Sequence, residues 1–208
     1  MEIILKYFPG LSPLQQNQYF LLNEQVIYWN RHINLVSRKD IDQLPVHHIL
    51  HSLGIALHAS FSPEDEVLDV GTGGGFPGLP LAILFPHTHF TLIDSIGKKV
   101  RAVDEISRSL ELPNVRCLQI RAENYTEKVH HIVSRAVTGL EKFTGWVGKN
   151  LISGSEITRS GIWYLKGGDL REELKPYPLA RVFELKEDYS EDFFDSKKLV
   201  WLPPKSLK

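Results

Sequence analysis

The apolar positions divide the chain into a helical N-terminal part and a longer part in which strands alternate with helices. One apolar stripe recurs at spacings of three and four: Tyr19, Leu22, Val26, Trp29 and Ile33. This spacing predicts a helix. Ser12 followed by Pro13 predicts where the helix begins, because serine caps a helix and proline suits its first position. A shorter helix capped by Asp40 and a further helix over residues 47–59 are also expected.

The longer part contains short apolar runs separated by helical patterns. We expect strands at residues 67–70, 89–94, 115–120, 131–137 and 161–168, and a terminal antiparallel hairpin of 180–186 with 197–202. Helices are expected over 98–110 and 140–151, and one beginning at 79. This alternation predicts an α/β fold with a mostly parallel seven-stranded sheet. The turn at 61–65 predicts a seam between an N-terminal helical extension, 1–62, and a core, 63–208, packed as one compact domain.

Residues 66–80, E-V-L-D-V-G-T-G-G-G-F-P-G-L-P, join a strand to a helix through a glycine-rich turn. Glycines let the backbone adopt positive φ and let a ligand approach the main chain closely. A strand, glycine loop and helix in this order are typical of a nucleotide-type cofactor site in a Rossmann-like sheet. The core is therefore predicted to be Rossmann-like.

The loop itself favours a cofactor without a pyrophosphate. Phe76 stands where the third glycine of a G-x-G-x-x-G fingerprint would allow tight packing around a pyrophosphate. S-adenosylmethionine (AdoMet) has no phosphate and needs room beside Gly71 and Gly73 for its sulfonium and amino-acid end. Asp94 follows the glycines by roughly 20 residues, where a carboxylate binds ribose hydroxyls. Ala122-Glu123, after the third strand, would lie near the adenine.

Composition narrows the class of protein. The formal net charge of −1 argues against a broad basic face, so any RNA contact would come from a local patch. No apolar run reaches about 18 residues, and the N-terminus lacks a signal-peptide pattern, so we expect a cytoplasmic protein without a membrane partner. A single cysteine excludes an intrachain disulfide. His47 and His51 have no acidic or cysteine partner nearby in the sequence, so no metal site is expected.

The residue types also limit the chemistry. Methylation of pyrimidine C5 needs a nucleophilic cysteine, but Cys117 falls in a predicted buried strand. The Asn/Asp-Pro-Pro-aromatic turn used for exocyclic amines is replaced by Ser134-Arg135-Ala136. A nucleophile that needs no proton removed, such as guanine N7, remains. Arg135 and Lys166 end predicted strands and are the candidate catalytic residues, since either could donate to guanine O6. Alternatively, Lys166 is an exposed strand-end lysine, and Arg135 forms a structural ion pair with an acid such as Glu123.

Several motifs occur in a fixed order over nearly the whole chain. They are N-x-x-I-N-L at 30–35, H-I-L-x-S at 48–52, D-V-G-T-G-G-G-F-P-G-L-P-L-A-I at 69–83, L-I-D-S-x-G-K-K-V at 92–100, A-E at 122–123, S-R-A at 134–136 and L-K-G at 165–167. This set resembles the RsmG (GidB) family, bacterial methyltransferases that modify guanine N7 in 16S ribosomal RNA.

The resemblance implies a class I AdoMet-dependent methyltransferase fold. It implies cofactor contacts at these positions: Gly71, Phe76, Asp94, Ala122, Glu123 and Arg135. The implied substrate is 16S ribosomal RNA within a ribosomal particle. We expect the protein itself to be a monomer. His51, where the family often has aspartate, and the C-terminal residues 199–205 depart from the family pattern. A small-molecule N- or O-methyltransferase, which the near-neutral charge favours, and a non-enzymatic RNA-binding or assembly protein remain alternatives.

Overall fold

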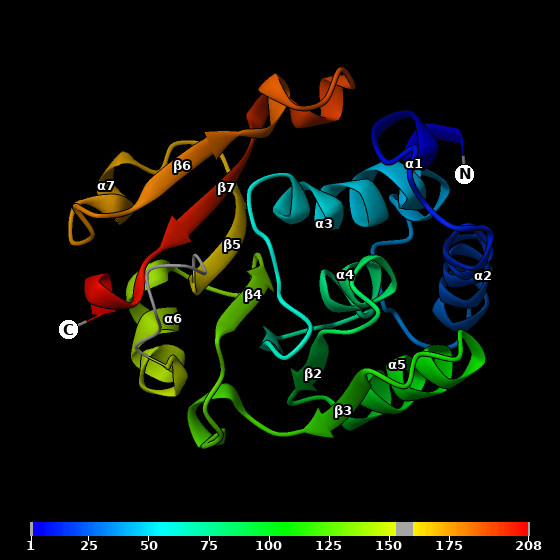
Figure 1. Ribbon diagram of the computed structural model, residues 1–208, viewed down its shortest axis with the longest axis horizontal. Helices are drawn as coiled ribbons and strands as arrows, with labels where there is room; N and C mark the ends of the chain where they lie inside the picture. Colours follow the sequence, from blue (N-terminus) through cyan, green and yellow to red (C-terminus); the bar gives the residue numbers. More distant parts are fainter. Residues whose placement is uncertain (1, 153–159, 208) are drawn as a thin grey trace.

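A computed structural model describes residues 2–152 and 160–207 of the chain, and its centre is one seven-stranded sheet (Figure 1). The strands are β1 (Glu66–Val70), β2 (His89–Asp94), β3 (Val115–Gln119), β4 (His131–Arg135), β5 (Gly161–Gly167), β6 (Arg181–Glu184) and β7 (Lys197–Leu202). Their order is β3-β2-β1-β4-β5-β7-β6. β1 to β5 pair in parallel, and β7 is antiparallel to both β5 and β6. The predicted sheet and its C-terminal hairpin are confirmed.

Alternate residues of the central strands enter two different hydrophobic clusters. Val67 of β1 and Leu92 of β2 belong to one cluster, whereas Leu68 and Ile93 belong to the other. Side chains on a strand point alternately to opposite faces, so each cluster covers one face of the sheet. A parallel sheet buried on both faces explains why its strands read as nearly continuous apolar runs.

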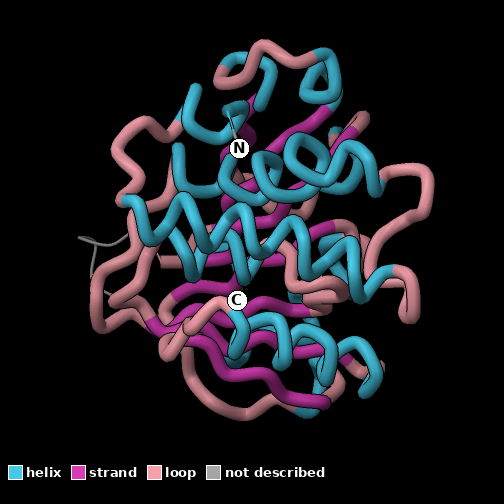
Figure 2. The backbone as a smooth tube through the Cα atoms, turned by 90° about the vertical axis from the view of Figure 1, so that its right-hand side faces the viewer, coloured by secondary structure: helices cyan, strands magenta, loops and turns pink. Residues whose placement is uncertain are grey.

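Helices cover both faces and give the three layers seen in Figures 1 and 2. The α-helices are α1 (Glu2–Tyr7), α2 (Pro13–Asn30), α3 (His51–Leu53), α4 (Gly78–Leu84), α5 (Gly97–Ser109), α6 (Leu140–Val147) and α7 (Arg171–Leu174). Side chains of α1 to α5 enter the cluster on one face, and those of α6 and α7 enter the cluster on the other. The helices α1 and α7 had not been predicted, because each is too short to show a helical repeat.

The predicted start of α2 is confirmed in detail. The Ser12 hydroxyl accepts a hydrogen bond from the Gln15 amide at 3.3 Å, and the Gln15 side chain accepts one from the Ser12 amide at 3.0 Å. This reciprocal capping box satisfies two backbone donors that a helix start leaves free. Tyr19 then donates to the Pro80 carbonyl at 2.8 Å, which fixes α2 against α4.

The segment 45–57 is helical but irregular. A π-helical turn, η2 (Pro45–Leu50), continues into α3 and then into a 3-10 turn, η3 (Gly54–Leu57). The expected cap on the preceding short helix is wrong. Asp40 precedes η1 (Ile41–Gln43) but makes no capping bond, because its carboxylate contacts His47 Nδ1 at 3.1 Å.

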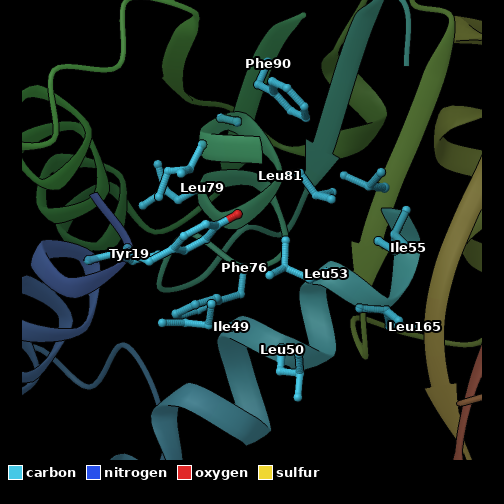
Figure 3. Packing of buried hydrophobic residues seen from close by; sticks show 14 of the residues in the cluster. Tyr19, Ile49, Leu50, Leu53, Ile55, Phe76, Leu79, Leu81, Phe90 and Leu165 are labelled. Carbon is cyan, nitrogen blue, oxygen red and sulfur yellow. The ribbon is translucent and has the colours of Figure 1, made fainter. Parts of the chain in front are cut away.

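The N-terminal helical part contributes to the same core as the sheet. Tyr19 and Leu50 from residues 1–62 share one buried cluster with Phe76 and Leu165 (Figure 3). The division into 1–62 and 63–208 therefore stays a prediction about chain organisation, while the packing is continuous. Across residues 2–152 and 160–207, no helix is both long and apolar enough to cross a membrane.

Candidate functional site

The glycine-rich loop after β1 is held by a buried carboxylate. Asp69 Oδ2 accepts hydrogen bonds from the Thr72 hydroxyl at 2.6 Å and from the Gly78 amide at 2.9 Å. Burial raises the pKa of Asp69 to about 7. Asp69 thus ties both ends of the loop to the strand from which it emerges. Gly71 and Gly73 have φ of +69° and +59°, a region in which side chains are disfavoured.

A cavity of about 460 Å³ lies at the carboxyl ends of β1, β2 and β3. This is the edge at which ligands bind in open α/β sheets. Five residues predicted to hold a cofactor line it: Gly71, Gly73, Asp94, Ala122 and Glu123. The topology therefore brings together glycines from one loop, an acid from the next strand and a dipeptide following the third.

Asp94 is fixed in place and keeps free acceptor capacity. Its Oδ2 accepts from the Gly73 amide at 3.0 Å, and its Oδ1 accepts from the Ile96 amide at 2.9 Å. Each carboxylate oxygen has a second lone pair, so both can still accept a hydroxyl donor. Ile96, Ile120, Val137 and Trp146 supply apolar walls to the same cavity. A ligand with a ribose and a flat heterocycle fits this combination of groups.

Arg135 and Phe76 form a second group of predicted residues, which does not line this cavity. The Arg135 guanidinium donates to the His47 carbonyl at 3.2 Å and approaches His48 Nδ1 at 2.8 Å. Its central carbon lies 5.2 Å from the Phe76 ring centroid. Burial, followed by the Arg135 charge, lowers the pKa of His48 to about 3, so His48 is neutral and its Nδ1 is the acceptor.

The ion pair with Glu123 that the sequence left open for Arg135 is not formed within the described part of the chain. Glu123 lies 4.0 Å from Arg121 instead. Burial lowers the pKa of Arg135 to about 10, still well above neutral pH. Arg135 is therefore a partly buried cation held by neutral groups, which suits a residue that meets an anionic or acceptor-rich ligand.

Lys166 is neither exposed nor free. Its ammonium lies 2.5 Å from Glu173 and donates to the Thr138 carbonyl at 3.1 Å. Beside it, the Tyr164 hydroxyl accepts from the amides of Val137 and Thr138, both at 2.9 Å. These contacts clamp the loop that follows Arg135, and Val137 of that loop lines the cavity.

Some residues at the site had not been identified from the sequence. Val137 and Ile96 each stand two residues beyond a predicted site residue, so proximity in sequence was an available signal. Trp146, on α6, reaches the cavity only because α6 packs beside it, and no local pattern indicated this. Glu173 likewise becomes relevant only where α7 meets the loop after β4.

Two other expectations concern residues away from the cavity. Burial raises the pKa of the Cys117 thiol to about 12, so at neutral pH it is not a thiolate nucleophile. His47 and His51 contact the Phe193 ring, at 4.0 and 5.4 Å between centroids. Within the described ranges, no cluster of three or more histidine, cysteine or acidic residues could hold a metal ion.

The strand order, the antiparallel β7 and the cavity beside the glycine loop define a Rossmann-like fold of the class I methyltransferase type. Precorrin-6Y C5,15-methyltransferase from Geobacter metallireducens has the same fold, with a TM-score of 0.54 and 10% identity over 80% of this chain and 90% of that chain.

Sequence comparison is more specific than the fold. The family model described as GidB, rRNA small subunit methyltransferase G, matches residues 15–199, and the chain belongs to this family. Two relatives carry the name Ribosomal RNA small subunit methyltransferase G. The protein of Christiangramia forsetii is 50% identical over 99% of this chain and 98% of its own length. That of Flavobacterium johnsoniae is 51% identical over 99% of both chains. The family resemblance seen in the motifs is confirmed.

Proposed function

We propose that the protein is an AdoMet-dependent methyltransferase that transfers a methyl group to N7 of a specific guanine in 16S ribosomal RNA. The observation that carries this proposal is the cavity at the ends of β1 to β3, in a chain of this family. The protein would act as a cytoplasmic monomer on RNA presented in a ribosomal particle.

The residues that line the cavity suit AdoMet. Gly71 and Gly73 would lie beside its amino-acid end, Asp94 would accept from the ribose hydroxyls, and Ala122-Glu123 would contact the adenine. Ile96 and Trp146 add apolar surface for the adenine ring. When bound, AdoMet supplies an electrophilic methyl group on its sulfonium. AdoMet has no phosphate. This agrees with Phe76 at the position where a third glycine would allow tight packing around a pyrophosphate.

The remaining task of the protein is to align the guanine. N7 has a free lone pair, so no general base is required, and alignment of two reactants can contribute several kcal/mol, about 7 or more in favourable cases. Arg135 would contact both the cofactor and the guanine. Its guanidinium has N–H donors beyond those bound to the His47 carbonyl and to His48 Nδ1. The Lys166 ammonium has one N–H donor beyond its bonds to Glu173 and Thr138, and this donor would orient the base through O6. A donor to N7 itself would block the reaction.

The test uses ribosomal particles and naked 16S RNA from a strain that lacks the protein. Incubation with labelled AdoMet should label one guanine, and mapping should place the methyl on N7. Transfer to carbon or to an exocyclic amine would refute the mechanism. Turnover on a metabolite without RNA would favour the small-molecule enzyme. Absence of AdoMet binding by calorimetry would favour a non-enzymatic assembly protein.

A further inference from the structure

A second concave surface lies where α2 ends. It is a groove of about 480 Å³ lined by Ile27, Asn30, Arg31, Arg38 and Ile41. We call it the arginine groove. Two of its five lining residues are cations and none is an acid. This composition contrasts with the net charge of −1 for the whole chain.

The cations at this surface have no protein partner. Arg31, Arg38 and the adjacent Lys39 are exposed, and none of their side chains forms an ion pair or hydrogen bond with the described residues. The nearest acid in sequence, Asp40, is engaged by His47 at 3.1 Å, and Asp42 is exposed outside the groove lining. In contrast, most other exposed arginines contact a carboxylate, such as Arg116 with Glu127 and Arg171 with Asp169.

Backbone hydrogen bonds hold the side chain of Asn30, which lines the groove. Asn30 is 6% exposed, and its Oδ1 accepts from the amides of Leu35 at 2.8 Å and Val36 at 3.0 Å. Its Nδ2 donor has no partner among residues 2–152 and 160–207 and belongs to a groove-lining side chain. Tyr28, 54% exposed, and His32 form an aromatic pair beside Arg31, with centroids 5.6 Å apart. Exposed rings beside cations suit nucleotides, which present both a phosphate and a flat base.

The groove is connected rigidly to the cofactor loop. A methyl group placed on Gly74 would lie only 3.1 Å from Leu35 Cβ and 3.3 Å from the Leu35 carbonyl oxygen. The segment carrying Arg31 and Arg38 therefore packs directly on the glycine-rich loop through Leu35, which is buried. A strand of RNA held at the groove would be fixed relative to the bound cofactor.

We propose that the arginine groove binds the phosphate backbone of the RNA substrate beside the guanine that is methylated. This inference rests on the proposed function and adds the surface that holds the RNA. Arg31, Arg38 and Lys39 would contact phosphates, the Asn30 amide would donate to the same strand, and Tyr28 would offer a stacking surface. Phosphate contacts of this kind position a nucleic acid without reading its sequence.

The experiment measures binding of the full chain to small ribosomal subunits from a strain lacking the protein, across about 50 to 200 mM salt. Each lost phosphate contact reduces the slope of log affinity against log salt by roughly one. The triple variant Arg31→Gln, Arg38→Gln and Lys39→Gln should therefore lower the slope by about 2 to 3. Its affinity at low salt should fall at least about tenfold, while its AdoMet affinity and melting temperature stay at the parental values.

A matched control removes one unpaired cation elsewhere. Lys186 is exposed, has no partner in the described structure, and lies at a different cavity. Lys186→Gln should keep the parental slope, whereas Arg38→Gln alone should lower it by about one. An unchanged slope in the triple variant would overturn the proposal. The proposal would also be overturned if the triple variant lost binding to subunits but bound naked 16S RNA like the parent. The groove would then bind a ribosomal protein and not RNA. If the parent protein neither binds nor methylates the subunits, the proposed function itself fails.

Discussion

Replacing Gly71 by alanine tests whether the cavity at the glycine loop binds the cofactor. Gly71 has φ of +69°, and a Cβ placed there would lie 2.6 Å from Val137 Cγ2. The left-handed backbone costs an alanine roughly 1 to 2 kcal/mol. The overlap adds about 1 to 3 kcal/mol, the usual cost of overpacking. We therefore expect Gly71→Ala to lower the free energy of unfolding by about 2 to 5 kcal/mol.

The effect on cofactor binding follows from the position of Val137. To relieve the overlap, either the Gly71 backbone or the Val137 side chain must move, and both line the cavity. A wall displaced by a fraction of an ångström should weaken AdoMet binding at least about tenfold, or about 1.4 kcal/mol. Calorimetric titration measures this affinity, and urea unfolding measures stability. A Gly71→Val change should abolish binding and lower the free energy of unfolding further than Gly71→Ala, because its branched side chain is larger.

The chain supplies two controls that separate backbone strain from steric overlap. Gly168 has φ of +75° with no atom within 4 Å of its added Cβ, so Gly168→Ala should lose only the strain energy and bind AdoMet normally. Gly73 has φ of +59° and only the Gly71 carbonyl nearby, at 3.9 Å. An alanine at position 73 would line the cavity without a clash, so the AdoMet affinity of Gly73→Ala should lie between those of Gly71→Ala and Gly168→Ala. Parental AdoMet affinity in Gly71→Ala, with stability equal to that of Gly168→Ala, would refute the reasoning.

Three further changes test the surroundings of the site and the far end of the sheet. Tyr164→Phe leaves two loop amides without their acceptor, so we expect a loss of about 1 to 3 kcal/mol in urea unfolding and weaker AdoMet binding; parental values for both would contradict the clamp. Lys166→Ala should reduce methyl transfer at least about tenfold through misalignment of the base, with AdoMet affinity retained; an affinity loss like that of Tyr164→Phe would mean that Lys166 acts through the loop. Burial lowers the pKa of His131, beside Asp65, to about 4 from an ordinary value near 6.5, so the unfolded state binds more protons in that interval. The stability that His131 supports is therefore present above pH 6.5 and is lost towards pH 4, by about 3 kcal/mol. His131→Gln should reduce the dependence of the free energy of unfolding on pH between 6.5 and 4. An unchanged dependence in this interval would mean that His131 does not cause it.

Local sequence determined most of the fold. The helix start at Ser12 formed as predicted, because the capping bonds join Ser12 to Gln15, only three residues away. The bounds of β2 and β7 agree with the apolar runs, since strands in a buried sheet are bounded by polar turns. The helix expected over residues 47–59 formed, but its π and 3-10 turns could not be predicted. The very short helices α1 and α7 could not be predicted either, because tertiary packing rather than a repeat stabilises them.

The candidate site shows the same division. The glycine loop, Asp94 and Ala122-Glu123 were predicted together, because the carboxyl ends of successive parallel strands must meet at one edge. The partners of Arg135 and Lys166 were not predicted. His48 and Glu173 lie 87 and 7 residues away from them in sequence, and only the packing of two helices against the sheet brings these groups into contact.

Read from its sequence alone, this chain specifies a Rossmann-like sheet, a cofactor loop suited to AdoMet and membership of a ribosomal RNA methyltransferase family. These properties follow from patterns that are local or fixed by strand order. The tertiary structure alone decided that Asp69 fixes the loop, that Lys166 is clamped to Glu173, and that Arg31 and Arg38 share a groove beside the glycine loop. Such contacts depend on how separate elements pack against one another, which no sequence spacing records.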